Sequence, residues 1–391
     1  MYRRSQRGDP RARRRGFTLV ELLVVITIIG MLMAMMFPAL GTVMDAVNLN
    51  RCSNNLVSVG KAIQGYQSAA SNAWPVVSTE PVNGKPALAV AEQTMNKRAS
   101  TRPTRGGRRV EEKATASGYS WLVTLLPYMG EDPTYKAINA RSKGFTRSAF
   151  DPALVDDNNK HFSMQSVKVL QCPVFEGAAE IAYTSAAPEY KRFAQGVGDG
   201  GGAVALTNYV AISATHMSLV IPPNANDPGP PPNGVIYFNS QRKGPTRIPD
   251  GDSNTVVVTE TREPSYASWF DGTTSWVVAA DPNSPAPVER GGKWVCEPSA
   301  GCRHALNVGP DSGEGGDETQ VTYYRKRSTS WPGDADWAYG PSSMHAGGMV
   351  VHLYGDKRVI PIRAMGPTQI SASVYMAIVT RAGSETESYT P

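Results

Sequence analysis

The chain of 391 residues has few of the side chains on which most catalytic and metal sites depend, with only five histidines and four cysteines. It contains neither an H-E-x-x-H motif nor a Cys-x2-Cys pair, so zinc catalysis has little support. No Gly-x-Ser-x-Gly nucleophile motif occurs, and the glycine-rich stretch 309–316 lacks the Lys-Ser/Thr ending of a phosphate-binding loop. We therefore predict no enzymatic activity and no resident cofactor, although calcium stays a candidate ligand.

Charged residues are also scarce, at 19% of the chain, and the basic ones are unevenly placed. Residues 1–16 contain seven arginines and one aspartate, which is a net charge of +6. Subtracting it from the formal +5 of the whole chain leaves −1 for the remainder. Because the net excess of positive charge lies in one short terminal segment, we expect no nucleic-acid partner. The hydrophobic fraction of 41% excludes a wholly disordered chain.

A long apolar segment follows the arginines. Residues 17–40 number 24, which is about 36 Å of helix and enough to cross a hydrocarbon core of about 30 Å. The arginines predict a cytoplasmic N-terminus, a single pass through the inner (cytoplasmic) membrane and an extracytoplasmic remainder, periplasmic or in a filament. A secretory signal peptide cut near Gly41 and a twin-arginine signal at residues 3–4 are the alternatives. The length of the run and Glu21 inside it argue against the first, and the missing consensus argues against the second.

The sequence R-G-F-T-L-V-E at residues 15–21 resembles the type IV prepilin processing motif. The resemblance implies that a prepilin peptidase cuts between Gly16 and Phe17 and that the new Phe17 amine is N-methylated. It also implies that Glu21 pairs with the Phe17 amine of a neighbouring subunit during assembly. A buried carboxylate and a buried amine are each costly alone, and pairing offsets both costs. Pro38 falls where pilin helices carry a helix-bending proline.

Residues 41–72 continue an apolar stripe at helical spacing, which predicts an amphipathic extension of the membrane helix. Residues 73–391 form the predicted exported head, in which we interpret the basic stretch 80–117 as a flexible insertion. The head shows no βαβ alternation, so we predict an α+β fold, with the long helix packed on an antiparallel sheet as the pilin resemblance implies. The expected strands are 203–212, 235–239, 255–261, 276–280, 349–354 and 357–362, with a closing helix at 367–382.

Nearly the whole chain resembles the prepilin-like proteins that are abundant in planctomycetes, whose C-terminal domain of unknown function carries an H-x9-D-G signature. The matching segments occur in order at residues 51–56, 120–128, 170–173, 234–235, 248–255 with Glu260, and 380–385. The resemblance implies a structural subunit of a pseudopilus, a type II secretion-like system or an envelope filament. Its implied partners are prepilin peptidase, membrane lipid and other pilin-like subunits, in a homo- or hetero-oligomer.

The signature itself departs from the family pattern. Nine residues follow His345, but Gly355-Asp356 then replaces the expected Asp-Gly. An Asp-Gly pair suits a type I′ hairpin turn, and a leading glycine suits type II′. We therefore predict a structural hairpin in which His345 approaches Asp356, rather than a metal-ligand pair.

The four cysteines are an even number in a domain predicted to face an oxidising compartment, which favours disulfides. Cys296 and Cys302 enclose a short loop, and Cys52 could join the helix to Cys172. Three connectivities remain open. A metal site formed by Cys302 and His304 is the alternative.

Residues Asp250, Asp252 and Asn254 place oxygen side chains as the first half of a calcium loop does. Thr255 and Thr261 stand where that loop needs glycine and an acid, so turn chemistry is the competing interpretation. The resemblance to the major pseudopilins of type II secretion, which commonly hold calcium in a late loop, keeps calcium as a candidate ligand.

A second function is compatible with the same sequence, namely a membrane-anchored module whose head binds a glycan or another exported polymer. Exposed aromatic side chains would be its mark, and the candidates are Trp269, Phe270 and Trp276. The same three residues could equally belong to the core.

Overall fold

The computed structural model describes most of the chain, in segments. These are residues 18–79, 118–147, 149, 151, 153–175, 180–181, 204–216, 219–220, 232–237, 244–262, 267–272, 274–281, 284–290, 293–295, 301–307, 340–364 and 368–381. Several predictions made from the sequence fall outside these residues. They are the leader 1–16, Phe17, the basic insertion 80–117, Cys296 and the glycine-rich stretch 309–316.

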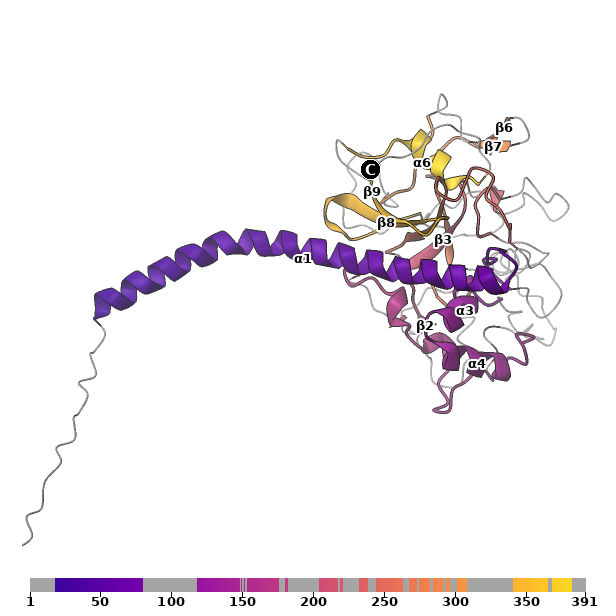
Figure 1. The fold of residues 1–391 in the computed structure, drawn as a ribbon, viewed down its shortest axis with the longest axis horizontal. Helices are drawn as coiled ribbons and strands as arrows, with labels where there is room; N and C mark the ends of the chain where they lie inside the picture. The colour runs from indigo at the N-terminus through magenta and orange to yellow at the C-terminus, as the bar shows by residue number, and fades with distance from the viewer. Residues whose placement is uncertain are drawn as a thin grey trace, which may run out of the picture. The chain divides into compact units, whose positions relative to one another are not determined.

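The N-terminal part of the described chain is one helix, α1 (Leu19–Ala69) (Figure 1). Its residue range includes Pro38. It begins with a capping box, since Thr18 and Glu21 exchange side chain-to-backbone hydrogen bonds. It ends where Ser71 and Asn72 adopt left-handed backbone angles, with φ of 55° and 62°. The predicted extension to residue 72 is therefore three residues too long. Contacts divide the chain into two units, Met1–Val47 and Asn48–Pro391.

The first unit contains the apolar beginning of α1. Large apolar side chains between Leu19 and Met33 are exposed, from 78% at Leu19 to 45% at Val25. Among the residues that the structure describes, no helix has both the length and the apolar character that crossing a membrane requires. The span predicted for residues 17–40 stays a prediction.

The second unit is built around a five-stranded sheet of order β5-β3-β4-β8-β9. Its strands are β3 (Tyr209–Ala214), β4 (Val256–Glu260), β5 (Trp276–Val278), β8 (Met349–Tyr354) and β9 (Val359–Arg363). The α+β class is confirmed, but the sheet is mixed and not purely antiparallel. Strand β5 pairs in parallel with β3, whereas the other three pairings are antiparallel. Because β3 and β4 are antiparallel and β5 is parallel to β3, β5 runs opposite to β4.

Other elements refine the predicted strands. The expected strand 203–212 divides into β2 (Val204–Ala205), which pairs with β1 (Glu180–Ile181), and β3. Of the expected strand 235–239, the described residues 235–237 form no strand, although Val235 and Ile236 are buried. The remaining elements are α3 (Trp121–Leu125), α4 (Asp132–Arg141), β6 (Val288–Arg290), β7 (Lys293–Val295), α6 (Ala372–Val379) and the 3-10 helices η1 (Leu126–Tyr128), η2 (Phe162–Met164), η3 (Lys168–Leu170) and η6 (Ala346–Gly348).

The two faces of the sheet are covered by different helices. Neighbouring residues of a strand point to opposite faces. On β8, Leu353 faces the second half of α1, where a Cβ added to Gly60 would lie 3.0 Å from its Cδ1 atom. The adjacent His352 faces α6 and contacts Tyr375. Gly60 therefore permits the close approach of α1 to the sheet.

His352 forms a buried polar link between β8 and α6. Its Nδ1 atom lies 2.9 Å from Val350 O and its Nε2 atom lies 2.9 Å from the Tyr375 hydroxyl. A carbonyl only accepts, so Nδ1 carries the proton and Nε2 accepts from Tyr375. Burial lowers the pKa of His352 to about 3.

This burial predicts an acid-sensitive fold. An unfolded histidine gains a proton below about pH 6.5, whereas folded His352 stays neutral to about pH 3. Stability that is complete above pH 6.5 is therefore lost as the pH falls towards 3, and His352 contributes about 2 kcal/mol of that loss by pH 5. We expect His352→Gln to lose less unfolding free energy than the parent between pH 7 and pH 5 in urea titrations.

The control is Tyr375→Phe, which removes the hydroxyl but leaves the buried imidazole, and so keeps the full acid loss. His161 and His216 are also buried, with pKa values lowered to about 4, so some acid loss persists in every variant. An equal loss in His352→Gln and in the parent would contradict the prediction.

Candidate functional site: a buried disulfide beside a histidine–glutamate pair

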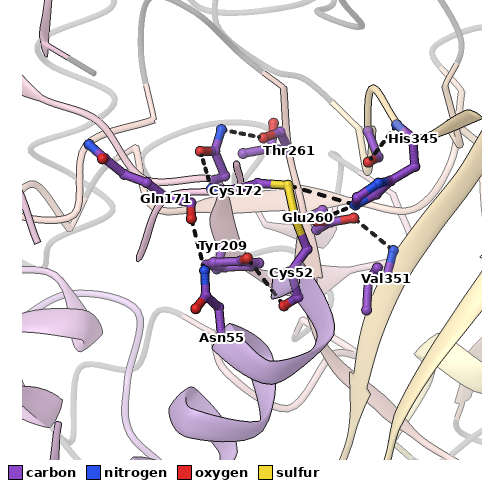
Figure 2. The surroundings of a disulfide bond; sticks show 11 residues. Cys52, Asn55, Gln171, Cys172, Tyr209, Glu260, Thr261, His345 and Val351 are labelled. Atoms are coloured by element: carbon purple, nitrogen blue, oxygen red, sulfur yellow. Dashed lines mark hydrogen bonds and ion pairs between the residues drawn. A yellow bond between two sulfur atoms is a disulfide. The ribbon is translucent and has the colours of Figure 1, made fainter. Parts of the chain in front are cut away.

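The site begins with a covalent bond between α1 and the head. Cys52 lies on the buried face of α1, and Cys172 follows the short helix η3. The two form a disulfide that joins positions 120 residues apart (Figure 2). The structure thus forms one of the pairings that the sequence left open. Cys302 is also disulfide-bonded, and it is therefore not a free ligand for the metal site considered with His304.

Asn208 fixes the Cys172 side of the bond. Its side-chain oxygen accepts the Cys172 backbone N–H at 2.9 Å, and its amide nitrogen donates to Thr261 O at 3.0 Å. Asn208 is only 2% exposed and lies in the chain just before β3. The loop that carries Cys172 is therefore held to the ends of two central strands.

Two hydrogen bonds fix the helix side. The Tyr209 hydroxyl donates to Cys52 O at 3.2 Å, and the Asn55 amide donates to Gln171 O at 2.9 Å (Figure 2). Burial raises the pKa of Tyr209 well above its usual value, and the nearby Glu260 carboxylate raises it further. Tyr209 therefore acts as a neutral donor across the physiological range.

Glu260 and His345 lie against the disulfide as a buried pair (Figure 2). His345 Nε2 is 3.4 Å from Glu260 Oε1 and 3.7 Å from Cys172 Sγ, and both side chains are 2% exposed. Glu260 Oε2 accepts the Val351 backbone N–H at 2.9 Å. Within the described residues, Glu260 Oε1 and His345 Nδ1 have no hydrogen-bond partner. Burying a carboxylate at this depth costs free energy, and the His345 imidazole and the Val351 N–H both offset part of that cost.

Glu260 is the member of the site that sequence reasoning missed. It appeared only as a residue shared with the family, with no role. The available signal was its position as the one acid at the end of a buried strand, V-V-V-T-E at residues 256–260.

The predicted approach of His345 to Asp356 is wrong, because His345 lies beside Glu260 and Asp356 is bound by Arg358. The turn also differs from type II′, since Gly355 lacks a positive φ and Lys357 has a φ of 72°. Glycine is needed for space, because a Cβ at Gly355 would lie 2.9 Å from Asp252 O. This contact explains why glycine comes first in the Gly-Asp pair.

The three calcium candidates form a turn beside that hairpin. The Asn254 side-chain amide donates to Asp250 O at 3.1 Å, and Asp252 O accepts the Asp356 N–H at 3.0 Å. Gly251 supplies the left-handed angle of the turn, with a φ of 91°. These contacts account for the local sequence as turn chemistry, and calcium binding here stays a prediction.

The remaining candidates are the three aromatic residues and the residues of the processing motif. Trp269, Phe270 and Trp276 are at most 4% exposed, so they belong to the core and offer no exposed aromatic platform. Gly16 and Phe17 lie outside the described residues. Glu21 is described, and its Oε2 atom accepts from both the backbone N–H and the hydroxyl of Thr18, at 2.8 and 2.9 Å.

Two family models match the chain. Residues 50–356 match the model of a family described as proteins of unknown function (DUF1559), and residues 11–37 match the prokaryotic N-terminal methylation motif. The chain belongs to the DUF1559 family and carries a prepilin-like N-terminus. No curated protein and no solved structure gives a significant match.

The disulfide should make a large contribution to the stability of the head. A cross-link between residues 120 positions apart restricts the unfolded chain strongly. We expect the double variant Cys52→Ala/Cys172→Ala to lose about 3–5 kcal/mol of unfolding free energy, measured by urea titration of the full chain in detergent.

The matched control is Ser58→Ala, an α1 substitution that removes only a hydroxyl bonded to Asn54 O. It should change the unfolding free energy by no more than about 0.5 kcal/mol. A loss in the double variant as small as that in the control would show that the disulfide is not what holds α1 to the head.

Proposed function

We propose that this DUF1559 protein is a pilin-like structural subunit that assembles into a pseudopilus, a type II secretion-like structure or an envelope filament. Prepilin peptidase cuts the chain between Gly16 and Phe17, and the new terminal amine is methylated. Before assembly, the subunit resides in the inner membrane, with residues 17–40 in lipid and its head outside the cytoplasm. It then polymerises with other pilin-like subunits. The match to the N-terminal methylation motif carries this proposal.

The exposed apolar beginning of α1 supports assembly. Leu19, Leu22, Ile26 and Met31 are each between 58% and 78% exposed, and their neighbours are similarly uncovered. Exposure of a continuous apolar surface of this kind to water is unfavourable, so lipid or protein has to cover it. Lipid covers it before assembly, and the helices of neighbouring subunits cover it afterwards.

The position of Glu21 supports pairing with a neighbouring subunit. In the uncleaved chain its carboxylate is satisfied by Thr18, which caps the start of α1. Cleavage would place a positive amine on Phe17, next to that cap. A carboxylate within an apolar helix bundle needs a cationic partner, and the methylated amine of the adjacent subunit supplies one.

The head is attached firmly enough to be carried by the helix. Cys52, Asn55 and Gly60 connect the second half of α1 to the head through a disulfide, a hydrogen bond and close packing. A disulfide of this kind persists in an oxidising compartment, which agrees with an extracytoplasmic head. A subunit that transmits force from an assembling helix to its head needs such a connection.

Two substitutions of Glu21 separate charge pairing from helix capping. Glu21→Gln keeps an oxygen for the Thr18 N–H but removes the charge, and Glu21→Ala removes both. We expect both variants to be inserted and cleaved normally but to be absent from sheared filaments, measured by fractionation and immunoblotting of cells that express the full chain.

The control is Asp45→Asn, which removes the next acidic charge of α1, also exposed. It should assemble like the parent. Parental amounts of Glu21→Gln in the filament fraction would contradict the pairing, because only the charge differs in that variant.

A further inference from the structure

The disulfide and the buried Glu260–His345 pair together bring four potential metal ligands close to one another. Among the described residues, the one group of three or more Cys, His, Asp or Glu side chains that could hold a metal ion is Cys52, Cys172, Glu260 and His345. One ligand atom from each lies within 4.8 Å of all the others, and all four residues are buried. They come from α1, the loop after η3, strand β4 and the segment before β8.

The side chains of His345 and Glu260 place their potential ligand atoms close to the disulfide. His345 Nε2 faces both Cys172 Sγ and Glu260 Oε1, at 3.7 and 3.4 Å. Glu260 is oriented through one oxygen by the Val351 N–H, and its Oε1 atom is directed at the cluster and has no hydrogen-bond partner among the described residues. A carboxylate fixed through one oxygen and open at the other is the arrangement that metal-binding carboxylates show.

We infer that opening the Cys52–Cys172 disulfide converts this cluster into a four-ligand site for Zn²⁺ or a similar divalent metal. Two thiolate sulfurs, one imidazole nitrogen and one carboxylate oxygen are donors that tetrahedral zinc accepts. In the oxidised chain the two sulfurs are bonded to each other and are not thiolates. The redox state of the cysteines therefore decides whether the chain binds metal there.

A dithiol is the reductant that opens the Cys52–Cys172 disulfide. The dithiol gives two electrons and two protons to the Cys52–Cys172 bond, which breaks into two thiols, and the dithiol closes to its own disulfide. The metal ion then displaces both thiol protons, which pass to solvent. The bound ion faces two thiolates, the Glu260 carboxylate and a neutral His345, so its charge largely offsets theirs.

Such a site would matter for the subunit before its disulfide forms or after the disulfide is reduced. Reduction removes the covalent link between α1 and the head and leaves two thiols beside a buried carboxylate. A metal ion bound by both cysteines rejoins the same two segments through coordination bonds. The inference does not depend on filament assembly, because it concerns only the head and the second half of α1.

The test uses the full chain in detergent, with Cys296→Ser and Cys302→Ser introduced so that only one cysteine pair can be reduced. The chain is reduced with excess dithiol, desalted without oxygen and titrated with Co²⁺, which reports thiolate ligation in the near ultraviolet and tetrahedral geometry in the visible spectrum. We expect one equivalent of cobalt to bind with both signatures, and no such binding before reduction.

Variants of the other two ligands complete the test. Glu260→Gln keeps an acceptor for the Val351 N–H, and His345→Gln removes the imidazole. Each removes a metal ligand, so each should weaken cobalt binding by at least the roughly 10–100-fold that loss of an outer-shell partner costs. His352→Gln, which changes a buried histidine on the opposite face of the sheet, should leave cobalt affinity unchanged. Tryptophan fluorescence follows folding in each sample.

Several results would overturn the inference. A reduced, folded chain without the thiolate signature would do so, as would cobalt affinity unchanged in both Glu260→Gln and His345→Gln. Unfolding on reduction that cobalt does not reverse would exclude a site in the native head. If removing the second cysteine pair prevents folding, the same titration of the parent chain decides, through the loss of affinity in the Glu260 and His345 variants.

Discussion

The packing of the second half of α1 on the central sheet is the interaction on which the rest of the second unit depends. Gly60 lets the helix approach Leu353 of β8, and the Cys52–Cys172 disulfide holds it to the loop before the sheet. Tyr209 adds a hydrogen bond from the central strand β3 to the helix backbone. Because these contacts involve α1, the Cys172 loop and two central strands, loss of the helix would uncover the middle of the sheet and not only one edge.

Buried polar groups define both faces of that sheet. On the face towards α6, His352 is neutral and satisfied by Tyr375 and Val350. On the face towards α1, Glu260 is held by Val351 and His345 beside the disulfide. Such groups are costly to bury and are tolerated only with their partners in place, so each pair favours one arrangement of its helix on the sheet. Among the described residues, Glu260 Oε1 and His345 Nδ1 have no hydrogen-bond partner, whereas both ring nitrogens of His352 have one, and this difference supports the inference of metal binding.

The sequence was most informative where a local pattern carries the physics. The apolar periodicity gave α1 to within three residues of its end, and short runs bounded by Gly, Pro, Asn and Asp clusters located β3, β4, β5, β8 and β9 approximately. The partner of His345 could not be predicted, because Glu260 lies 85 positions away and only the strand order brings the two together. The parallel pairing of β5 could not be predicted either, because it depends on the edge of the sheet at which β5 joins. The even number of cysteines predicted disulfides, but the pairing of Cys52 with Cys172 required the folded chain.

The proposal that the chain is a processed pilin-like subunit joins the exposed apolar start of α1, the capped Glu21 and the firm attachment of α1 to the head. Its central claim is that the mature chain begins at Phe17. N-terminal mass spectrometry of the protein recovered from its native membrane tests this claim most directly. The account predicts a chain that begins with N-methylated Phe17. A chain that begins near Gly41, or one that retains Met1, would contradict it.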